Sequence, residues 1–463
     1  MVTIEFLGGV GTVTGSKFLL EVAGRRLLVD CGLYQGPKEL RLRNWDRLPV
    51  DPVSIDRVVL THGHIDHTGY LPRLFKDGFK GPVYATRATA DLLKILLPDS
   101  GHLQEEEAEY HNKRGTSKHK PALPLYTAEE GLKAAERVTG VGYDEAVELA
   151  PGVRVSFKRA GHILGSAIVT IESEEGTGRF RLIFSGDLGR YNAPILPDPA
   201  PIDEADYIVV ESTYGDRRHD PEPIQAQLER VITSAVRLGG GIVIPAFAVG
   251  RTQELLYDLD ALEKAGRLPR LPTYVDSPMA IEATEIYCAH PEEFDGEMRT
   301  LVATRRCPLT SGEFRLARTT EQSKAINAIR GPVLIISASG MATGGRVLHH
   351  LKHRLPDPRT TVLLVGYQAV GTRGRSLQDG ASSVRIFGQD VPVRARIEVV
   401  HGLSAHADAD GLMRWLRTAT RPPKRVFVVH GDPGPAQALA SRVKSELGWT
   451  VVVPAYRDHA TIS

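Results

Sequence analysis

The chain has little cysteine, no long apolar run and no excess of charge of either sign. Its three cysteines, Cys31, Cys288 and Cys307, are odd in number and lack CxxC spacing, which disfavours both a disulfide framework and a thiolate zinc site. Any metal is therefore expected to bind His and carboxylate side chains. No apolar run is long enough to cross a bilayer, and residues 1–6 do not resemble a signal peptide. The sequence thus predicts a cytoplasmic protein with no membrane partner.

The overall charge does not decide between classes of partner. The formal net charge is +1, and a neutral protein can still carry a local basic groove, so nucleic acid is neither required nor excluded. Fixed-period repeats and low-complexity tracts are also lacking. Hydrophobic residues make up 42% and charged residues 24% of the chain, as in ordinary folded proteins. At 463 residues the chain is longer than a single hydrophobic core usually accommodates, which predicts two domains. One domain could be inserted in the other.

Short β-branched apolar runs that end at a polar or glycine residue recur along the sequence. Residues 27–29 end at Asp30, residues 182–184 lead to Asp187, and residues 208–210 end at Glu211. Such runs are typical of buried strands with functional residues behind them. Helical patterns lie between some of them, one expected from an Asp220 cap to about Gly239. The predicted fold class is α/β, with an antiparallel hairpin over residues 17–30.

The most informative stretch is residues 61–69, THGHIDHTG, directly after a predicted strand. His62, His64, Asp66 and His67 offer nitrogen and oxygen ligands of the kind that Zn²⁺ accepts, and Gly63 lets the backbone bend so that they converge. A single histidine is better explained as a surface or packed residue. Four ligand-type residues at this spacing favour a metal site.

The motif HGHIDH matches the HxHxDH signature of the metallo-β-lactamase superfamily, and this resemblance spans nearly the whole chain. It implies an αββα sandwich. Asp30 in LLVDCG resembles the first family motif, a carboxylate that fixes the histidine loop. His162 in AGHILGS resembles the third, and Asp187 in FSGDLG the fourth. Taken alone, Asp30 and Asp187 are equally well explained as turn or cap residues, and His162 as a packed imidazole.

Three further motifs resemble the β-CASP group of this superfamily. They are Glu211 in ESTYG (motif A), His406 in SAHAD (motif B) and His430 in HG (motif C), and residues 244–251 and 337–341 also resemble β-CASP segments. The group includes ribonuclease J and the endonuclease subunit of the eukaryotic pre-messenger-RNA 3′-end machinery. Some relatives act on DNA, but a histidine in motif C resembles the RNA-acting branch. The chain resembles a short prokaryotic member.

The resemblance implies two zinc ions and a role for each residue of these motifs. His62, His64 and His162 are expected to hold one zinc, Asp66, His67 and His430 the other, with Asp187 bridging both. A hydroxide activated by the two metals would attack phosphorus, leaving 5′-phosphate and 3′-hydroxyl ends. His406 is expected to protonate the leaving oxygen, with Glu211 holding it. Without the resemblance, Glu211 as a strand-end charge and His406 as a capping group remain alternatives.

Substrate contacts are expected from small polar and basic residues. The run 337–340 follows an apolar strand and can present N–H and hydroxyl groups to a phosphate, while arginines could neutralise the RNA backbone. The alternative is that residues 371–375 form a surface turn and that Arg251 is ion-paired at a helix start. The predicted substrate-binding residues are Ser337, Ser339, Gly340, Ser404, Arg251, Arg373 and Arg375.

We therefore expect a metallo-β-lactamase domain over residues 1–208 and 391–463, with a β-CASP domain over residues 209–390 inserted between. The active site is expected in the cleft between the two predicted domains. The inserted domain is expected to cover the site and to restrict its substrates to single-stranded RNA. Two rival functions stay open: another zinc hydrolase, acting on DNA, a thioester or a β-lactam, and an RNA-binding scaffold without catalysis. The sequence also leaves open endonuclease or exonuclease action, RNA sequence preference and oligomeric state, a homodimer included.

Overall fold

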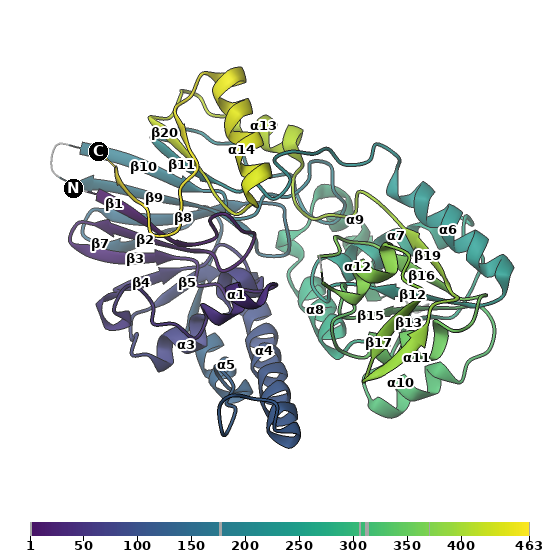
Figure 1. Cartoon of the computed structure of the whole chain (residues 1–463). Coiled ribbons are helices and arrows are strands. Elements are labelled where there is room, and N and C mark those ends of the chain that lie inside the picture. Colours follow the sequence, from purple (N-terminus) through teal and green to yellow (C-terminus); the bar gives the residue numbers. More distant parts are fainter. Residues whose placement is uncertain (1, 176–177, 305–306, 311–313, 370, 463) are drawn as a thin grey trace. The chain divides into compact units, whose positions relative to one another are not determined.

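The chain folds into two compact units, each of which mixes helices and strands (Figure 1). The computed structural model describes residues 2–175, 178–304, 307–310, 314–369 and 371–462. Unit 1 consists of Met1–Ala193, Pro197–Arg218 and His406–Ser463, and unit 2 consists of Pro194–Leu196 and His219–Ala405. The α/β class is confirmed. Unit 2 overlaps most of the insertion predicted at residues 209–390, but its main segment begins at His219 and ends at Ala405.

Unit 1 contains two seven-stranded sheets. The first has the order β22 (His459–Ile462), β1 (Val2–Gly8), β2 (Lys17–Val22), β3 (Arg25–Val29), β4 (Arg57–Val59), β5 (Val83–Thr86) and β6 (Val138–Val141). The second has the order β21 (Val451–Val452), β20 (Arg425–Val428), β11 (Tyr207–Val210), β10 (Gly178–Phe184), β9 (Ala167–Glu175), β8 (Val153–Arg159) and β7 (Ala146–Ala150). The expected hairpin is present, because β2 and β3 pair antiparallel with Val22 opposite Arg25. Strands β3 to β6 run parallel.

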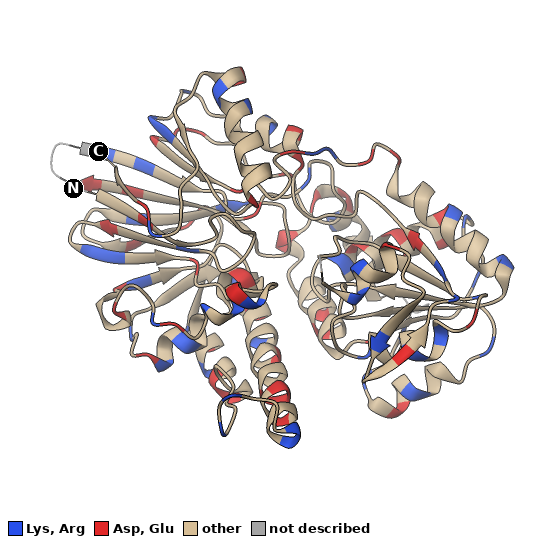
Figure 2. Ribbon diagram, in the orientation of Figure 1, with Lys and Arg blue, Asp and Glu red and all other residues tan. Residues whose placement is uncertain are grey.

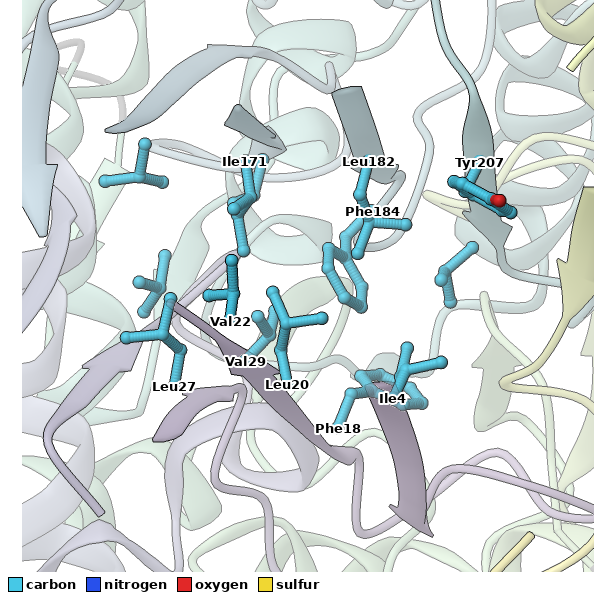
Figure 3. Close-up of a cluster of buried hydrophobic side chains, with 14 of the residues drawn as sticks. Ile4, Phe18, Leu20, Val22, Leu27, Val29, Ile171, Leu182, Phe184 and Tyr207 are labelled. Atoms are coloured by element: carbon cyan, nitrogen blue, oxygen red, sulfur yellow. The ribbon is translucent and has the colours of Figure 1, made fainter. Parts of the chain in front are cut away.

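One apolar cluster joins the two sheets face to face (Figure 3). Phe18 and Leu20 from the first sheet are buried in it together with Leu182 and Phe184 from the second. The alternation of apolar and polar residues along β1 and β8 places one apolar row of each strand in this layer. The sheets therefore form the inner two layers of a sandwich.

Helices cover the outer face of each sheet and complete an αββα arrangement. Leu71, Leu93 and Leu97 pack on the first sheet, whereas Leu412 and Trp415 pack on the second. Figure 2 shows charged residues of both signs at the far end of α4. The helices of unit 1 are α1 (Lys38–Leu42), α2 (Ile65–Thr68), α3 (Leu71–Lys76), α4 (Arg87–Arg114), α5 (Ala128–Ala135), α13 (Ala409–Leu416) and α14 (Pro433–Arg442), with the shorter turns η1 (Pro52–Ser54) and η4 (Val443–Leu447). In the part of the chain that the structure describes, no helix is long and apolar enough to cross a membrane.

Unit 2 is built on a six-stranded parallel sheet. Its order is β14 (Phe314–Leu316), β13 (Thr273–Val275), β15 (Val333–Ser337), β12 (Gly241–Pro245), β16 (Thr361–Leu364) and β19 (Arg396–Val399), and a separate hairpin pairs β17 (Ser383–Ile386) with β18 (Gln389–Pro392). Strands β12 and β15 are buried along their whole length, as expected for a parallel sheet covered on both faces. The helices are α6 (Ile224–Leu238), α7 (Arg251–Lys264), α8 (Pro278–Ala289), α9 (Gly296–Thr304), α10 (Thr320–Asn327), α11 (Val347–Arg354) and α12 (Arg373–Gln378), with η2 (Pro291–Glu293) and η3 (Pro308–Thr310).

Two features of unit 2 were not predicted correctly from the sequence. Helix α6 begins at Ile224 and not after Asp220, because Pro223 disfavours helical geometry at the residue before it. The cysteine count and spacing, which disfavoured a disulfide framework, also gave no sign of the disulfide that Cys288 and Cys307 form, with their Cα atoms 6.0 Å apart. Their separation of 19 residues carries no recognisable spacing, and only the tertiary fold brings them within bonding range.

Candidate metal centre

The predicted metal ligands all belong to unit 1, where loops following several strands bring them together. The histidine motif begins at His62, three residues after the end of β4, and continues into the single turn of α2, with His64 as the N-cap of that turn. Asp66 and His67 lie in this turn and belong to one group of candidate ligands, whereas His62 and His64 precede the turn and belong to another. The imidazole rings of His62 and His67 are 4.1 Å apart between centroids, so the two groups of ligands are neighbours.

Four side chains converge in the first group: His62, His64, His162 and Asp187. Nδ1 of His64 lies 3.0 Å from Nε2 of His62 and 3.2 Å from Nε2 of His162. Oδ2 of Asp187 lies 3.4 Å from the same atom of His62 and 3.6 Å from that of His162. Three nitrogens and one oxygen thus point at a common centre.

The second group consists of Asp66, His67 and His430, and Asp187 faces it with its other oxygen. Oδ1 of Asp187 lies 3.4 Å from Nε2 of His67 and 3.7 Å from Nε2 of His430. Oδ2 of Asp66 lies 3.8 Å and 3.7 Å from these two nitrogens. The Asp187 carboxylate therefore stands between the two groups, one oxygen toward each.

The spacing of these atoms fits a metal ion. Ligand atoms about 2.0–2.2 Å from a tetrahedral zinc lie about 3.3–3.6 Å from one another, and the separations in the first group are 3.0–3.6 Å. Among the described residues, the buried atoms Nε2 of His67 and Oδ1 of Asp187 have no hydrogen-bond partner. Such buried polar atoms are costly unless another species satisfies them. A cation between the ligands would do so.

Asp30 fixes the orientation of the histidine loop. Its Oδ2 lies 2.8 Å from Nδ1 of His67, and it accepts hydrogen bonds from the backbone N–H and hydroxyl of Thr61 at 2.8 and 3.0 Å. Because Nδ1 of His67 donates to this carboxylate, Nε2 is left as the ligand atom. The position expected for Asp30 behind the loop agrees with this geometry.

Ser16 is a site residue that the sequence analysis missed. Its Oγ lies 2.8 Å from Nδ1 of His430, which directs Nε2 of His430 toward Asp66 and Asp187. His430 also has a φ of 47°, an uncommon conformation for a residue with a side chain. Nothing in the sequence of the glycine-rich loop 8–16 links it to a histidine 414 residues away. Thr61, by contrast, could have been found, because it directly precedes His62.

Burial controls the ionisation of these groups. It lowers the pKa of His64 to about 3 and that of His430 to about 4, so both imidazoles are neutral and able to bind a metal at neutral pH. Burial also raises the pKa of Asp66 to about 6 and that of Asp187 well above its usual range. A divalent cation beside these carboxylates would oppose that rise by stabilising their charged form.

His406 and Glu211 form a pair next to the ligands. Nδ1 of His406 lies 3.2 Å from Oε2 of Glu211, while Glu211 also accepts hydrogen bonds from the backbone N–H of Leu188 at 2.7 Å and of Thr213 at 3.3 Å. Burial raises the pKa of Glu211, but His406, His430 and Thr213 together outweigh burial, and the pKa lies below its ordinary value. The side chain of His406 is 21% exposed, whereas that of Glu211 is fully buried. His406 alone can therefore reach a substrate.

The predicted substrate-binding residues belong to unit 2, and several of their polar groups already have protein partners. The Ser337 hydroxyl donates to the Asp276 carbonyl at 2.8 Å, and Ser339 Oγ accepts from the Thr343 N–H at 3.0 Å. Gly340 lies against Phe247, where a Cβ would come within 2.9 Å of the ring. Ser404 is half-buried, two residues before His406.

The three predicted arginines are also engaged within unit 2. Arg251 pairs with Glu254 at 2.7 Å, and Arg375 pairs with Asp379 at 2.8 Å. Arg373 donates to the backbone carbonyl of Arg385 at 2.6 Å. The ion pair of Arg251 at the start of α7 agrees with the alternative of an ion-paired helix start, whereas Arg373 and Arg375 lie in helix α12 and not in the surface turn of that alternative. An RNA-binding role for these residues stays a prediction.

Three family models match the chain. A β-lactamase superfamily domain matches residues 25–246, a Beta-Casp domain residues 252–377, and a Zn-dependent metallo-hydrolase RNA specificity domain residues 390–454. The first covers the loops that carry Asp30, the histidine motif and Asp187, and the third covers His406 and His430. The segments that carry the candidate ligands thus lie within these two matches, and the latter is described as a Zn-dependent metallo-hydrolase domain.

Similar curated proteins cover almost the whole chain. A ribonuclease of Thermus thermophilus, TTHA0252, is 39% identical over 93% of this chain and 94% of its own length. An RNase J-like protein of Methanocaldococcus jannaschii is 31% identical over 98% of both, and the transcription termination factor FttA of Methanosarcina mazei is 34% identical over 96% of this chain and 69% of its own. A crystal structure of a protein of unknown function from Enterococcus faecalis V583 matches with a TM-score of 0.56 at 12% identity over the full length of both chains, which shows the fold alone.

Proposed function

This chain belongs to the β-CASP family of metallo-β-lactamase-fold nucleases that process RNA, and from that premise we propose that it is a zinc-dependent ribonuclease. The proposed reaction is hydrolysis of RNA phosphodiester bonds, which leaves 5′-phosphate and 3′-hydroxyl ends. The RNA specificity domain and the ribonuclease names of two relatives support this substrate. Cleavage within the chain and stepwise cleavage from the 5′ end are both consistent with the proposal.

The observation that carries the proposal is the position of Asp187 between two sets of ligands. One oxygen faces His62 and His162, and the other faces His67 and His430. A carboxylate with an oxygen directed at each of two sites is suited to bridge two ions. Two zinc ions per chain are therefore proposed, because imidazole and carboxylate are ligands that zinc prefers.

The ligands divide between two zinc sites. His62, His64 and His162 would hold one ion, and Asp66, His67 and His430 the other, with Asp187 shared. Zinc bound there would supply an activated water and offset the negative charge that develops on the phosphate. The protein contributes the fixed directions of the ligand atoms, which Asp30, Thr61 and Ser16 maintain from behind.

His406 is proposed as the general acid. Glu211 is held by two backbone N–H groups and accepts from Nδ1 of His406, which leaves Nε2 as the atom that can pass a proton to the departing 3′ oxygen. Glu211 would also stabilise the charge of the protonated ring. A third metal site at Asp187, Glu211 and His406 is less suitable, because backbone donors already occupy both Glu211 oxygens.

The rival functions make different predictions. A thioester hydrolase has no need of His406 and Glu211 as an acid pair, because its thiolate leaving group departs without a proton. A scaffold subunit has no need of a complete ligand set, yet every predicted ligand of this chain converges on one of two groups. DNA remains a second candidate substrate only through the superfamily, and the RNA specificity domain favours RNA.

The test is product mapping on one RNA, labelled in turn at its 5′ and 3′ ends, with and without a metal chelator. We expect chelator-sensitive cleavage that zinc restores, 5′-phosphate ends on the downstream products, and no comparable cleavage of DNA of the same sequence. Asp187→Ala serves as the control for contaminating nuclease. Cleavage that persists in this variant, or thioester hydrolysis without RNA cleavage, would overturn the proposal.

A further inference from the structure

An aromatic and basic surface lies on unit 1, on and after helix α1. Residues 38–47, KELRLRNWDR, contain four basic and two acidic residues, and Figure 2 shows both signs on α1. Trp45 is 52% exposed and Tyr456, from the C-terminal segment, is 40% exposed. We call Lys38, Arg43, Trp45, Arg47 and Tyr456 the Trp45 surface. Exposed aromatic rings beside basic side chains are the combination that stacks on unpaired bases and contacts a phosphate backbone.

This surface is held rigidly to the core of unit 1. The side chain of Asn44 is buried and accepts a hydrogen bond from the Tyr34 N–H at 2.9 Å while donating to the Tyr34 carbonyl at 2.8 Å. Asn44 lies between Arg43 and Trp45 in the chain, so its anchoring presents both neighbours outward. The side chains of Arg43 and Trp45 are therefore attached to a backbone that is already ordered, which lowers the entropy cost of binding a ligand.

The cations of the Trp45 surface are not neutralised by acids. The Arg43 guanidinium lies 5.5 Å from the Tyr34 ring centroid and 4.9 Å from that of Tyr456. Within the described ranges, Lys38, Arg43 and Arg47 form no ion pair, whereas exposed arginines elsewhere in unit 1 do, as Arg25 with Asp56. A stacked arginine with a free charge can contact a phosphate or a base.

The surface adjoins the loops that hold the metal ligands. The Tyr34 ring packs on Gly15, where a Cβ would come within 2.5 Å of it, and the next residue, Ser16, is hydrogen-bonded to His430. The segment before Tyr34 runs along the histidine loop, since the Leu33 N–H donates to the Ile65 carbonyl at 2.9 Å. A polymer bound at the candidate metal centre would have only a short path to Arg43.

We infer that the Trp45 surface binds the single-stranded RNA substrate beside the metal centre, with Trp45 and Tyr456 stacking on unpaired bases and Arg43 contacting the backbone. This inference rests on the proposed function. Stacking needs bases that are not paired, and arginine supplies the charge that a phosphate backbone requires. The Trp45 surface would add affinity for RNA through residues other than the substrate-binding residues that the sequence predicts in unit 2.

The test is single-turnover cleavage measured over a range of RNA concentrations. We expect Arg43→Ala and Trp45→Ala each to raise the half-saturating RNA concentration on the order of tenfold, with the loss recovered at saturating RNA. Arg137→Ala is the matched control, because Arg137 is an exposed arginine of the same unit whose guanidinium lies 4.7 Å from the Phe75 ring. Arg137 lies between α5 and β6, next to the N-terminal end of β6. Because β4, β5 and β6 run parallel, this end of the sheet is opposite the end where the histidine motif follows β4.

Tryptophan fluorescence gives a second readout. Trp45 is one of three tryptophans, and Trp415 is fully buried, so RNA should quench the emission of a His406→Ala protein and quench it less after Trp45→Phe. Unchanged thermal midpoints exclude misfolding of the variants. If wild-type enzyme cleaves RNA but Arg43→Ala and Trp45→Ala behave like Arg137→Ala, the surface is no RNA site. If wild-type enzyme does not cleave RNA at all, the proposed function itself fails.

Discussion

The Ser16 hydroxyl lies 2.8 Å from Nδ1 of His430, although 414 residues separate them in the chain. This contact leaves Nε2 of His430 directed at the second group of ligands, 3.7 Å from Oδ2 of Asp66. The loop between β1 and β2 and the loop after β20 are thus joined at the candidate metal centre. The contact gives Ser16 a role in orienting His430, which a measurement of zinc affinity can test without measuring RNA cleavage.

Ser16→Ala is expected to weaken the second zinc site on the order of 10- to 100-fold, because His430 loses the group that orients it. The first site should keep its affinity. The measurement is competition with a zinc chelator, which resolves the two affinities. Ser173→Ala is the matched control, since Ser173 is equally buried in unit 1 but its hydroxyl has no partner among the described residues. Equal zinc affinities in the two variants would remove Ser16 from the site.

Asp187→Ala is expected to lower zinc content below the proposed two ions per chain and to abolish cleavage, because each of its oxygens faces a different group of ligands. Elemental analysis of zinc-reconstituted, desalted protein measures this. Asp203→Ala, which removes an exposed carboxylate of the same unit, should retain both ions and full activity. A wild-type protein with a single zinc after reconstitution would contradict the binuclear site.

Zinc binding is expected to weaken as the pH falls below about 6. Burial raises the pKa of Asp66 to about 6, so below that value the metal must displace a proton. Each displaced proton costs about tenfold in affinity per pH unit. His64 and His430 do not contribute until lower pH, because burial lowers their pKa values to about 3 and about 4. Chelator competition between about pH 5 and 8 tests this sign, and Asp66→Asn should flatten the curve.

The convergence of the candidate metal ligands could be predicted from the sequence because each of them follows an apolar strand in a short motif. His62, His64 and Asp66 lie within one loop, where sequence spacing and spatial proximity coincide. Ser16 could not be found, because a lone serine in a glycine-rich loop carries no signal for a contact made by tertiary folding. The same reason hides the pairing of Cys288 with Cys307.

Loss of the Cys288–Cys307 disulfide is expected to destabilise unit 2 and to leave the metal centre intact, since both cysteines lie in unit 2 and the ligands in unit 1. A closed loop of this size is worth about 3 kcal/mol. Calorimetry of Cys288→Ser should show a lower transition for unit 2 with zinc content unchanged. Reductant should lower the wild-type transition in the same way and have no further effect on the variant.

The pair of His406 and Glu211 separates an RNA-cleaving site from a general zinc hydrolase. Neither residue is among the proposed zinc ligands, so His406→Ala should retain zinc and RNA affinity while the cleavage rate falls on the order of 10²- to 10⁴-fold. Glu211→Gln should cause a smaller loss. Combining both changes should cost little more than His406→Ala alone, because the two residues act as a unit.

An RNA with a 3′-bridging sulfur at the cleavage site distinguishes proton transfer from other roles of His406. The sulfur departs as a thiolate without a proton, so an enzyme that lacks its general acid should cleave this linkage nearly as fast as wild type does. The comparison is single-turnover cleavage of the sulfur-linked and ordinary RNA by wild type and by His406→Ala. Nδ1 of His406 is engaged with Glu211 at 3.2 Å, so the proposal assigns the proton transfer to Nε2. Equal impairment of His406→Ala on both substrates would show that His406 binds the substrate and does not protonate it.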